Sequence, residues 1–243
     1  MIRSGFRAVV TATAAAGLGI SAFGERPLLV GTVAGICVLF SIGWPSLLGL
    51  PARRGAVVVL LLTSAAAVTV VELTDDVAWA ALVLAGSVLA TFVHELARRD
   101  GRPRLVESVA GTVAGCTVVV GGVGWLAVGT GGAQVGLLLT GSITLAVAAA
   151  VGAIPLPSPY STVVTIVVTA LVGTLVGYLL IAVGMTTGLL VGLAAGLLIA
   201  TVRHLFDQFP ASGQVLPALS AAMLPVAVSG LPVYVLGRVL MAG

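Results

Sequence analysis

Between Leu105 and Leu205 the chain contains one acidic side chain, Glu107, and one basic side chain, Arg203. A soluble domain of that length carries a charged residue at about one position in four. The whole chain of 243 residues is 8% charged and 59% hydrophobic, with a mean hydropathy of +1.23. These values exclude a water-soluble fold and predict an integral membrane protein.

The spanning segments are expected to be helices. Unpaired backbone groups are too costly in lipid, so only helices or closed barrels cross a bilayer, and runs such as 57–71 and 189–202 lack the alternation of a barrel strand. A spanning helix needs ~20 apolar residues. We therefore predict one all-α transmembrane domain, a polytopic helical bundle over residues 1–243, with about nine spans. Their expected ranges are 6–24, 28–49, 56–74, 77–97, 104–128, 134–154, 160–183, 186–206 and 215–238.

The loops between these spans alternate in charge. One set holds the arginines at positions 3, 7, 53, 54, 98, 99, 102, 104 and 203, whereas the other holds Glu25, Arg26, Asp75 and Asp76. Positive charge marks cytoplasmic loops, so we expect a multi-pass protein of the inner (plasma) membrane with a cytoplasmic N-terminus. Aromatic residues near span ends are expected at the membrane interfaces: Trp44, Trp79, Trp125, Tyr160 and Tyr234.

The densest polar segment is the hairpin at residues 94–107. Glu95 and Arg99 are four residues apart and are expected to pair along a helix end. The hairpin has two interpretations: a loop that only fixes topology, or a site for an anionic lipid or another phosphate, since a planar guanidinium binds phosphate oxygens in pairs. The candidate lipid- or phosphate-binding residues are Arg98, Arg99, Arg102 and Arg104, joined by Arg203 from the eighth span, and His94, Glu95 and Glu107 are candidates for polar pairing in the hairpin.

A second polar segment, residues 203–208, ends the eighth span. Arg203 and Asp207 are spaced for a helical pair, and His204 beside them leaves a proton-handling or headgroup-binding role open. On the opposite side, the acidic group at 72, 75 and 76 is either solvated or attracts a cation.

Charged groups are missing from the centres of the predicted spans. Proton- or ion-coupled transporters usually place such a group at mid-membrane, so that class is disfavoured. Uncharged transport sites remain open, with the threonines at 162, 165, 169 and 174 as candidates. We expect no metal site, no cofactor and no nucleic-acid partner. The two cysteines, Cys37 and Cys116, are expected to be packing residues.

Two segments carry a family resemblance. Leu216-Pro217 and the run from Pro232 to Leu236, followed by Arg238, resemble the last helix of the CDP-diacylglycerol synthase (phosphatidate cytidylyltransferase) family, and residues 105–115 resemble its middle region. The resemblance covers about a third of the chain and implies a lipid-related scaffold. The family's acidic, metal-binding signature is absent, because residues 218–227 are apolar apart from Ser220. The resemblance therefore implies a degenerate member that has lost the metal-dependent reaction.

Three functions follow as hypotheses. The first is a non-catalytic membrane protein that binds or handles a lipid, or serves as a membrane subunit of a partner protein. The second is a transporter or permease for a small neutral or lipidic solute, which would need a polar-lined cavity near mid-membrane. The third is a lipid nucleotidyltransferase, which the missing acidic signature disfavours.

Overall fold

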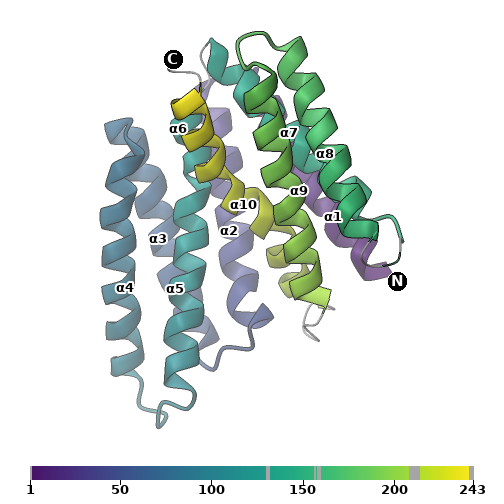
Figure 1. The fold of residues 1–243 in the computed structure, drawn as a ribbon. Helices are drawn as coiled ribbons and strands as arrows, with labels where there is room; N and C mark the ends of the chain where they lie inside the picture. The colour runs from purple at the N-terminus through teal and green to yellow at the C-terminus, as the bar shows by residue number, and fades with distance from the viewer. Residues whose placement is uncertain (1, 130–131, 156, 158–159, 208–213, 241–243) are drawn as a thin grey trace.

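The computed structural model describes residues 2–129, 132–155, 157, 160–207 and 214–240, and within them every regular element is helical (Figure 1). The chain is an all-α membrane bundle, as the sequence predicts. In chain order the elements are α1 (Ile2–Ser21), α2 (Arg26–Leu47), α3 (Arg53–Thr74), the short 3-10 helix η1 (Val77–Trp79), α4 (Ala80–Ala97), α5 (Leu105–Gly122), α6 (Gly124–Val128), α7 (Ala133–Gly152), α8 (Tyr160–Leu179), α9 (Met185–Asp207) and α10 (Val215–Leu240).

Eight helical segments of the described chain are long and apolar enough to cross a membrane. In two of them a short helix joins a long one, η1 with α4 and α5 with α6. The remaining predicted span, 6–24, corresponds to α1, whose apolar stretch Gly5–Ser21 is shorter. The predicted ranges therefore match the helices closely, with this first span as the marginal one.

The fifth span differs from its predicted form. Instead of one helix over 104–128, α5 ends at Gly122, Val123 makes a turn, and α6 follows. Here the chain passes very close to α10: a Cβ atom added at Gly124 would lie 2.6 Å from the Cα of Leu231. Glycine is therefore required at this crossing, and its low helix propensity accounts for the break.

Helix α10 occupies the middle of the bundle (Figure 1). It packs against α2, α5 and α6 on one side and against α1, α7 and α9 on the other, whereas α4 and α8 lie at opposite edges. Two prolines, Pro225 and Pro232, lie inside α10. A proline within a helix removes one backbone hydrogen bond and crowds the preceding turn, so the central helix cannot be a regular rod.

The tightest pairing in the bundle joins α8 to α9 through glycines. A Cβ at Gly173 would lie 2.9 Å from the Cα of Gly192, and one at Gly177 would lie 3.0 Å from the Cα of Gly188. The backbones thus touch directly, as small residues at four-residue spacing allow. These glycines therefore pack α8 against α9 within one chain.

Two of the aromatics expected at the membrane interfaces pack inside the bundle. Trp44 and Trp125 are buried, and their indole Nε1 atoms donate hydrogen bonds of 2.8 Å to the carbonyl oxygens of Gly111 and Val226. An indole N–H that is out of water needs such a partner, which a neighbouring helix supplies here. Both cysteines are buried and free, as expected of packing residues.

Candidate functional site

Glu95 is the buried centre of the predicted hairpin site, with 1% of its side chain exposed. Its carboxylate accepts hydrogen bonds of 2.6 Å from Ser108 Oγ and from Arg98 Nη1. His94 Nε2 lies 3.9 Å from the same carboxylate, too far for a hydrogen bond. The expected pairing of Glu95 with Arg99 is wrong, because α4 ends two residues before Arg99 and the helical spacing no longer applies.

Most of the hairpin arginines bind groups close to them. Arg98 also pairs with Asp100 at 2.6 Å, and these hydrogen bonds raise the pKa of Arg98 and hold the pKa of Asp100 below its ordinary value. Arg102 donates to two backbone carbonyls at the end of α4. Arg104 pairs with Glu107 and donates to a carbonyl in the loop between α2 and α3. These contacts order the hairpin and join it to the neighbouring loop.

The acidic group at the opposite end of the bundle also has a partner that the sequence does not indicate. Arg26 Nε lies 3.0 Å from Glu72 Oε1, and Arg26 Nη2 lies 2.9 Å from Asp75 Oδ1. Asp76 accepts a hydrogen bond from the first turn of η1. These carboxylates therefore fasten α2 to α3 and cap a helix.

A cavity of about 60 Å³ opens between α1, α7, α9 and α10, at the end of the bundle that carries most of the arginines. We call it the arginine cavity. About 10–15 Å³ of such space holds one water molecule, so the cavity has room for roughly five heavy atoms, the number in a phosphate group. Among the side chains that the structure describes, its lining contains two arginines and no acidic residue: Arg7, Ala8, Thr11, Ala149, Gly152, Ala153, Ile199, Val202, Arg203, Phe206, Ala221, Ala222 and Pro225.

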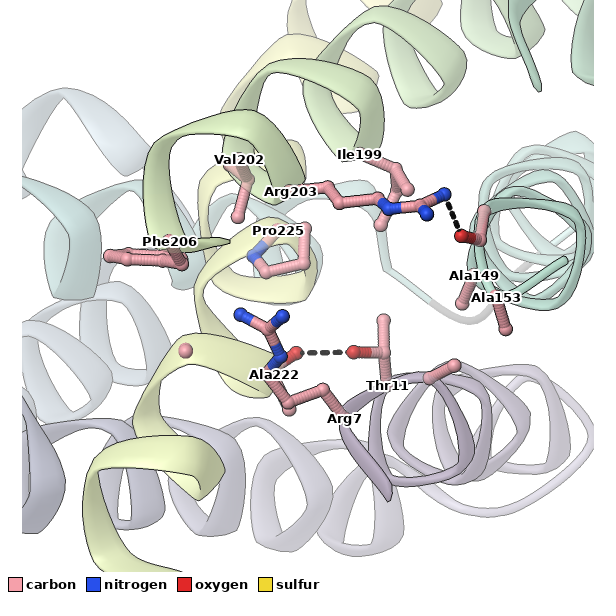
Figure 2. Close-up of a pocket in the computed structure, with 13 residues that line it drawn as sticks. Arg7, Thr11, Ala149, Ala153, Ile199, Val202, Arg203, Phe206, Ala222 and Pro225 are labelled. Carbon is pink, nitrogen blue, oxygen red and sulfur yellow. Dashed lines mark hydrogen bonds between the residues drawn. The ribbon is translucent and has the colours of Figure 1, made fainter. Parts of the chain in front are cut away.

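The two arginines enter the arginine cavity from different helices (Figure 2). Arg203 comes from α9, and its Nη1 donates to the carbonyl oxygen of Gly152 at the end of α7 and, at 2.8 Å, to Ser161 Oγ on α8. Arg7 comes from α1, where Thr11, one turn further, donates a 2.8 Å hydrogen bond to the carbonyl oxygen of Ala222 on α10. Four helices thus hold two positive charges around one small space.

The remaining residues predicted near Arg203 lie away from the cavity lining or outside the described residues. His204 Nε2 is 2.9 Å from Thr162 Oγ1, which joins α9 to α8. The side chain of Asp207 and the residue Gln208 lie outside the described residues. The residues that the sequence predicts for one site therefore lie in two places. Arg203 lines a cavity, and the hairpin residues form a separate network.

A second, larger cavity lies deeper in the bundle, between α7, α9 and α10. Its volume is about 290 Å³, and we call it the apolar cavity. Three of its lining residues carry a hydroxyl, namely Thr144, Thr201 and Ser229, and each donates to a carbonyl of its own helix. The cavity therefore presents mostly apolar surface, unlike the polar-lined mid-membrane cavity that a permease for a polar solute needs.

Arg7 is the site residue that the sequence alone does not single out, because an arginine at the start of a first span also serves simply to orient it. One signal was available: Arg7 and Thr11 are four residues apart, so they lie on the same face of a helix. A polar residue and a charge on one helical face, in a chain this apolar, indicate a face that does not meet lipid tails.

Comparison with known proteins returns no match: no family model, no curated protein and no solved structure matches this chain. The fold and the cavities themselves define the class. The protein is a multi-pass helical membrane protein with a cationic cavity near one end of the bundle and an apolar cavity beyond it.

Proposed function

We propose that this protein binds an anionic lipid and that the arginine cavity holds the phosphate of its headgroup. The observation that supports the proposal is the lining of that cavity, whose described residues place two guanidinium groups around a space of phosphate size. Guanidinium groups form strong, charge-assisted and often bidentate hydrogen bonds with phosphate oxygens. The sequence already offers Arg203 for this role, and Arg7 replaces the hairpin arginines as its partner.

The position of the cavity suits a lipid better than a soluble anion. Arg7 lies in the second turn of α1 and Arg203 lies about one turn before the described end of α9, the depth at which headgroups meet the hydrocarbon core. We further propose that this end faces the cytoplasm in the cell's inner (plasma) membrane, where anionic lipids attract basic groups.

The other hypotheses rank lower on particular observations. A permease for a neutral polar solute is less well supported, because the larger of the two cavities beside α10 is lined by apolar groups. A role as a membrane subunit of a partner protein is compatible with lipid binding and has no separate support. Kinship with the CDP-diacylglycerol synthase family stays a proposal, and its residues at 216–217 and 232–238 belong to α10, which lines both cavities.

The test is a binding measurement on the double variant Arg7→Gln/Arg203→Gln. The protein is reconstituted in nanodiscs of phosphatidylcholine with a minority of phosphatidylglycerol, and lipid that remains bound after gentle release is counted by native mass spectrometry. Hydrogen bonds to charged groups contribute ~1.5–3 kcal/mol each. We therefore expect the double variant to retain phosphatidylglycerol at least tenfold less well than the wild type, since 1.4 kcal/mol corresponds to about tenfold.

The matched control is Arg53→Gln/Arg54→Gln, which removes the same charge at the same end of the bundle. Both side chains are exposed at the start of α3, away from the arginine cavity. We expect the control to behave like the wild type in 0.15 M salt, where exposed charges are screened within ~8 Å. Equal retention by both double variants and the wild type would refute the proposed site. Inorganic phosphate at millimolar concentration distinguishes a lipid site from a site for free phosphate. If the cavity prefers free phosphate, the added phosphate displaces phosphatidylglycerol; if it prefers the lipid, phosphatidylglycerol stays bound.

A further inference from the structure

We propose that the bound lipid inserts one acyl chain into the apolar cavity between α7, α9 and α10. This inference rests on the proposed function, because it assigns the tail of the lipid whose phosphate occupies the arginine cavity. It names the ligand class more narrowly: an anionic amphiphile with a long acyl chain.

The two cavities follow the same face of α10. The residues of α10 that line the arginine cavity are at 221, 222 and 225, and those that line the apolar cavity are at 228, 229, 232 and 233. Their spacing of three or four residues defines one continuous helical stripe. The lining residues at the end of α7 and directly after it, 149, 152 and 153, and those earlier in α7, 141, 144 and 145, repeat this pattern in the opposite chain direction.

The depth of the apolar cavity fits an acyl chain. Along α7 and α10 the centres of the two sets of lining residues are about eight residues apart, which is about 12 Å at 1.5 Å per residue. Half of a hydrocarbon core is ~15 Å thick. A lipid with its phosphate in the arginine cavity therefore extends its tail directly past the apolar cavity.

The size and chemistry of the apolar cavity favour a hydrocarbon occupant over water. Its volume of about 290 Å³ exceeds that of an apolar cavity of ~150 Å³ that stays dry and binds benzene in another protein. The three hydroxyls in the lining already donate to their own helices, and a buried water needs two to four polar partners. Apolar atoms gain dispersion contacts in such a space, whereas water would lose hydrogen bonds there.

The sequence of α10 explains why space exists here. Pro225 lines the arginine cavity and Pro232 lines the apolar cavity, so each cavity adjoins one of the two prolines inside the helix. A proline ring prevents the regular packing of the preceding turn. The same residues that disturb α10 therefore leave space beside it at both cavities.

The experiment compares soluble short-chain lipids on the purified protein in detergent. Dihexanoyl- and dioctanoyl-phosphatidylglycerol bind in competition with a fluorescent phosphatidylglycerol, and their affinities are compared for wild type, Ala194→Phe and Ala85→Phe. Ala194 lines the apolar cavity, so phenylalanine there fills it. Ala85 is exposed on α4 and gives a matched control. Thr144→Leu, on α7, is a second filling variant in case Ala194→Phe does not fold.

Burial of each additional methylene raises affinity about fourfold, so two more carbons on one inserted chain give about fifteenfold. We expect this chain-length ratio for the wild type and for Ala85→Phe, and a ratio reduced to a few-fold in both filling variants, with dihexanoyl affinity unchanged. An equal ratio in all four proteins overturns the chain assignment and leaves the headgroup site intact. Failure of the proposed function looks different, because dihexanoyl-phosphatidylglycerol would then bind wild type and Arg7→Gln/Arg203→Gln equally.

Discussion

Gly188→Ala tests the packing that positions Arg203. Gly188 belongs to α9, and a Cβ added there would overlap the carbonyl oxygen of Gly173 on α8 and lie 3.0 Å from the Cα of Gly177. Ordinary contact for a Cβ begins at about 3.4 Å. All of these neighbours are backbone atoms, so the substitution cannot be accommodated by a side-chain rotation and must push the two helices apart.

The magnitude follows from two opposing effects. Inserting a methyl group into a tightly packed interface costs ~1–3 kcal/mol. Alanine is better than glycine in a helix by up to ~1 kcal/mol. The expected net loss is about 1–2 kcal/mol in the free energy of unfolding, and one kcal/mol lowers the melting temperature by about 2–4 °C for a chain of this length.

The assay is thermal unfolding in one detergent, followed by intrinsic tryptophan fluorescence. The control is Gly86→Ala on α4, where an added Cβ meets nothing within 4 Å. We expect Gly188→Ala to melt several degrees below Gly86→Ala. Because α8 supplies Ser161 to Arg203, the same variant should also retain less phosphatidylglycerol. Equal melting temperatures for the two variants would refute the backbone contact between α8 and α9.

Three further results are expected. Ser108→Ala removes the hydroxyl that donates to buried Glu95 and should lower the free energy of unfolding by ~1.5–3 kcal/mol, since the acceptor is charged. Chemical unfolding measures this loss, and an unchanged midpoint contradicts it. Trp125→Phe removes the indole donor to the carbonyl oxygen of Val226, which keeps its bond from Ser229 Oγ, and should lower the melting temperature by the equivalent of ~0.5–1.5 kcal/mol. Arg98 holds the pKa of Asp100 below its ordinary value of 3.8. The pair therefore stabilises the folded protein above that pH, and this stabilisation is lost as the pH falls through the lowered pKa. An NMR titration of the Asp100 carboxyl with its midpoint at or above the ordinary value contradicts the pair.

The helices of this protein could be predicted because their signals are local. Charges and prolines end each apolar run, so the predicted spans 134–154 and 186–206 correspond to α7 and α9 within about two residues. The break after α5 was missed for the opposite reason. It depends on how closely residue 124 approaches α10, and no hydropathy pattern records that distance.

The candidate site was predictable only in part. Four arginines close together in the hairpin give a strong sequence signal, yet Arg98, Arg102 and Arg104 bind acidic groups and carbonyls near them. Arg7 and Arg203 lie at opposite ends of the chain, and only the packing of α1, α7, α9 and α10 brings them to one cavity. Which arginines converge is a property of tertiary contacts, and these do not follow from the spacing of residues along the chain.

The most direct test of the lipid site is a structure of the protein in nanodiscs that contain phosphatidylglycerol. We expect density for a lipid phosphate within hydrogen-bond distance of both Arg7 and Arg203, with a tail that runs along α10 into the apolar cavity. Lipid phosphate ordered only at the hairpin of residues 98–104, with no lipid phosphate at these two guanidinium groups, would contradict it.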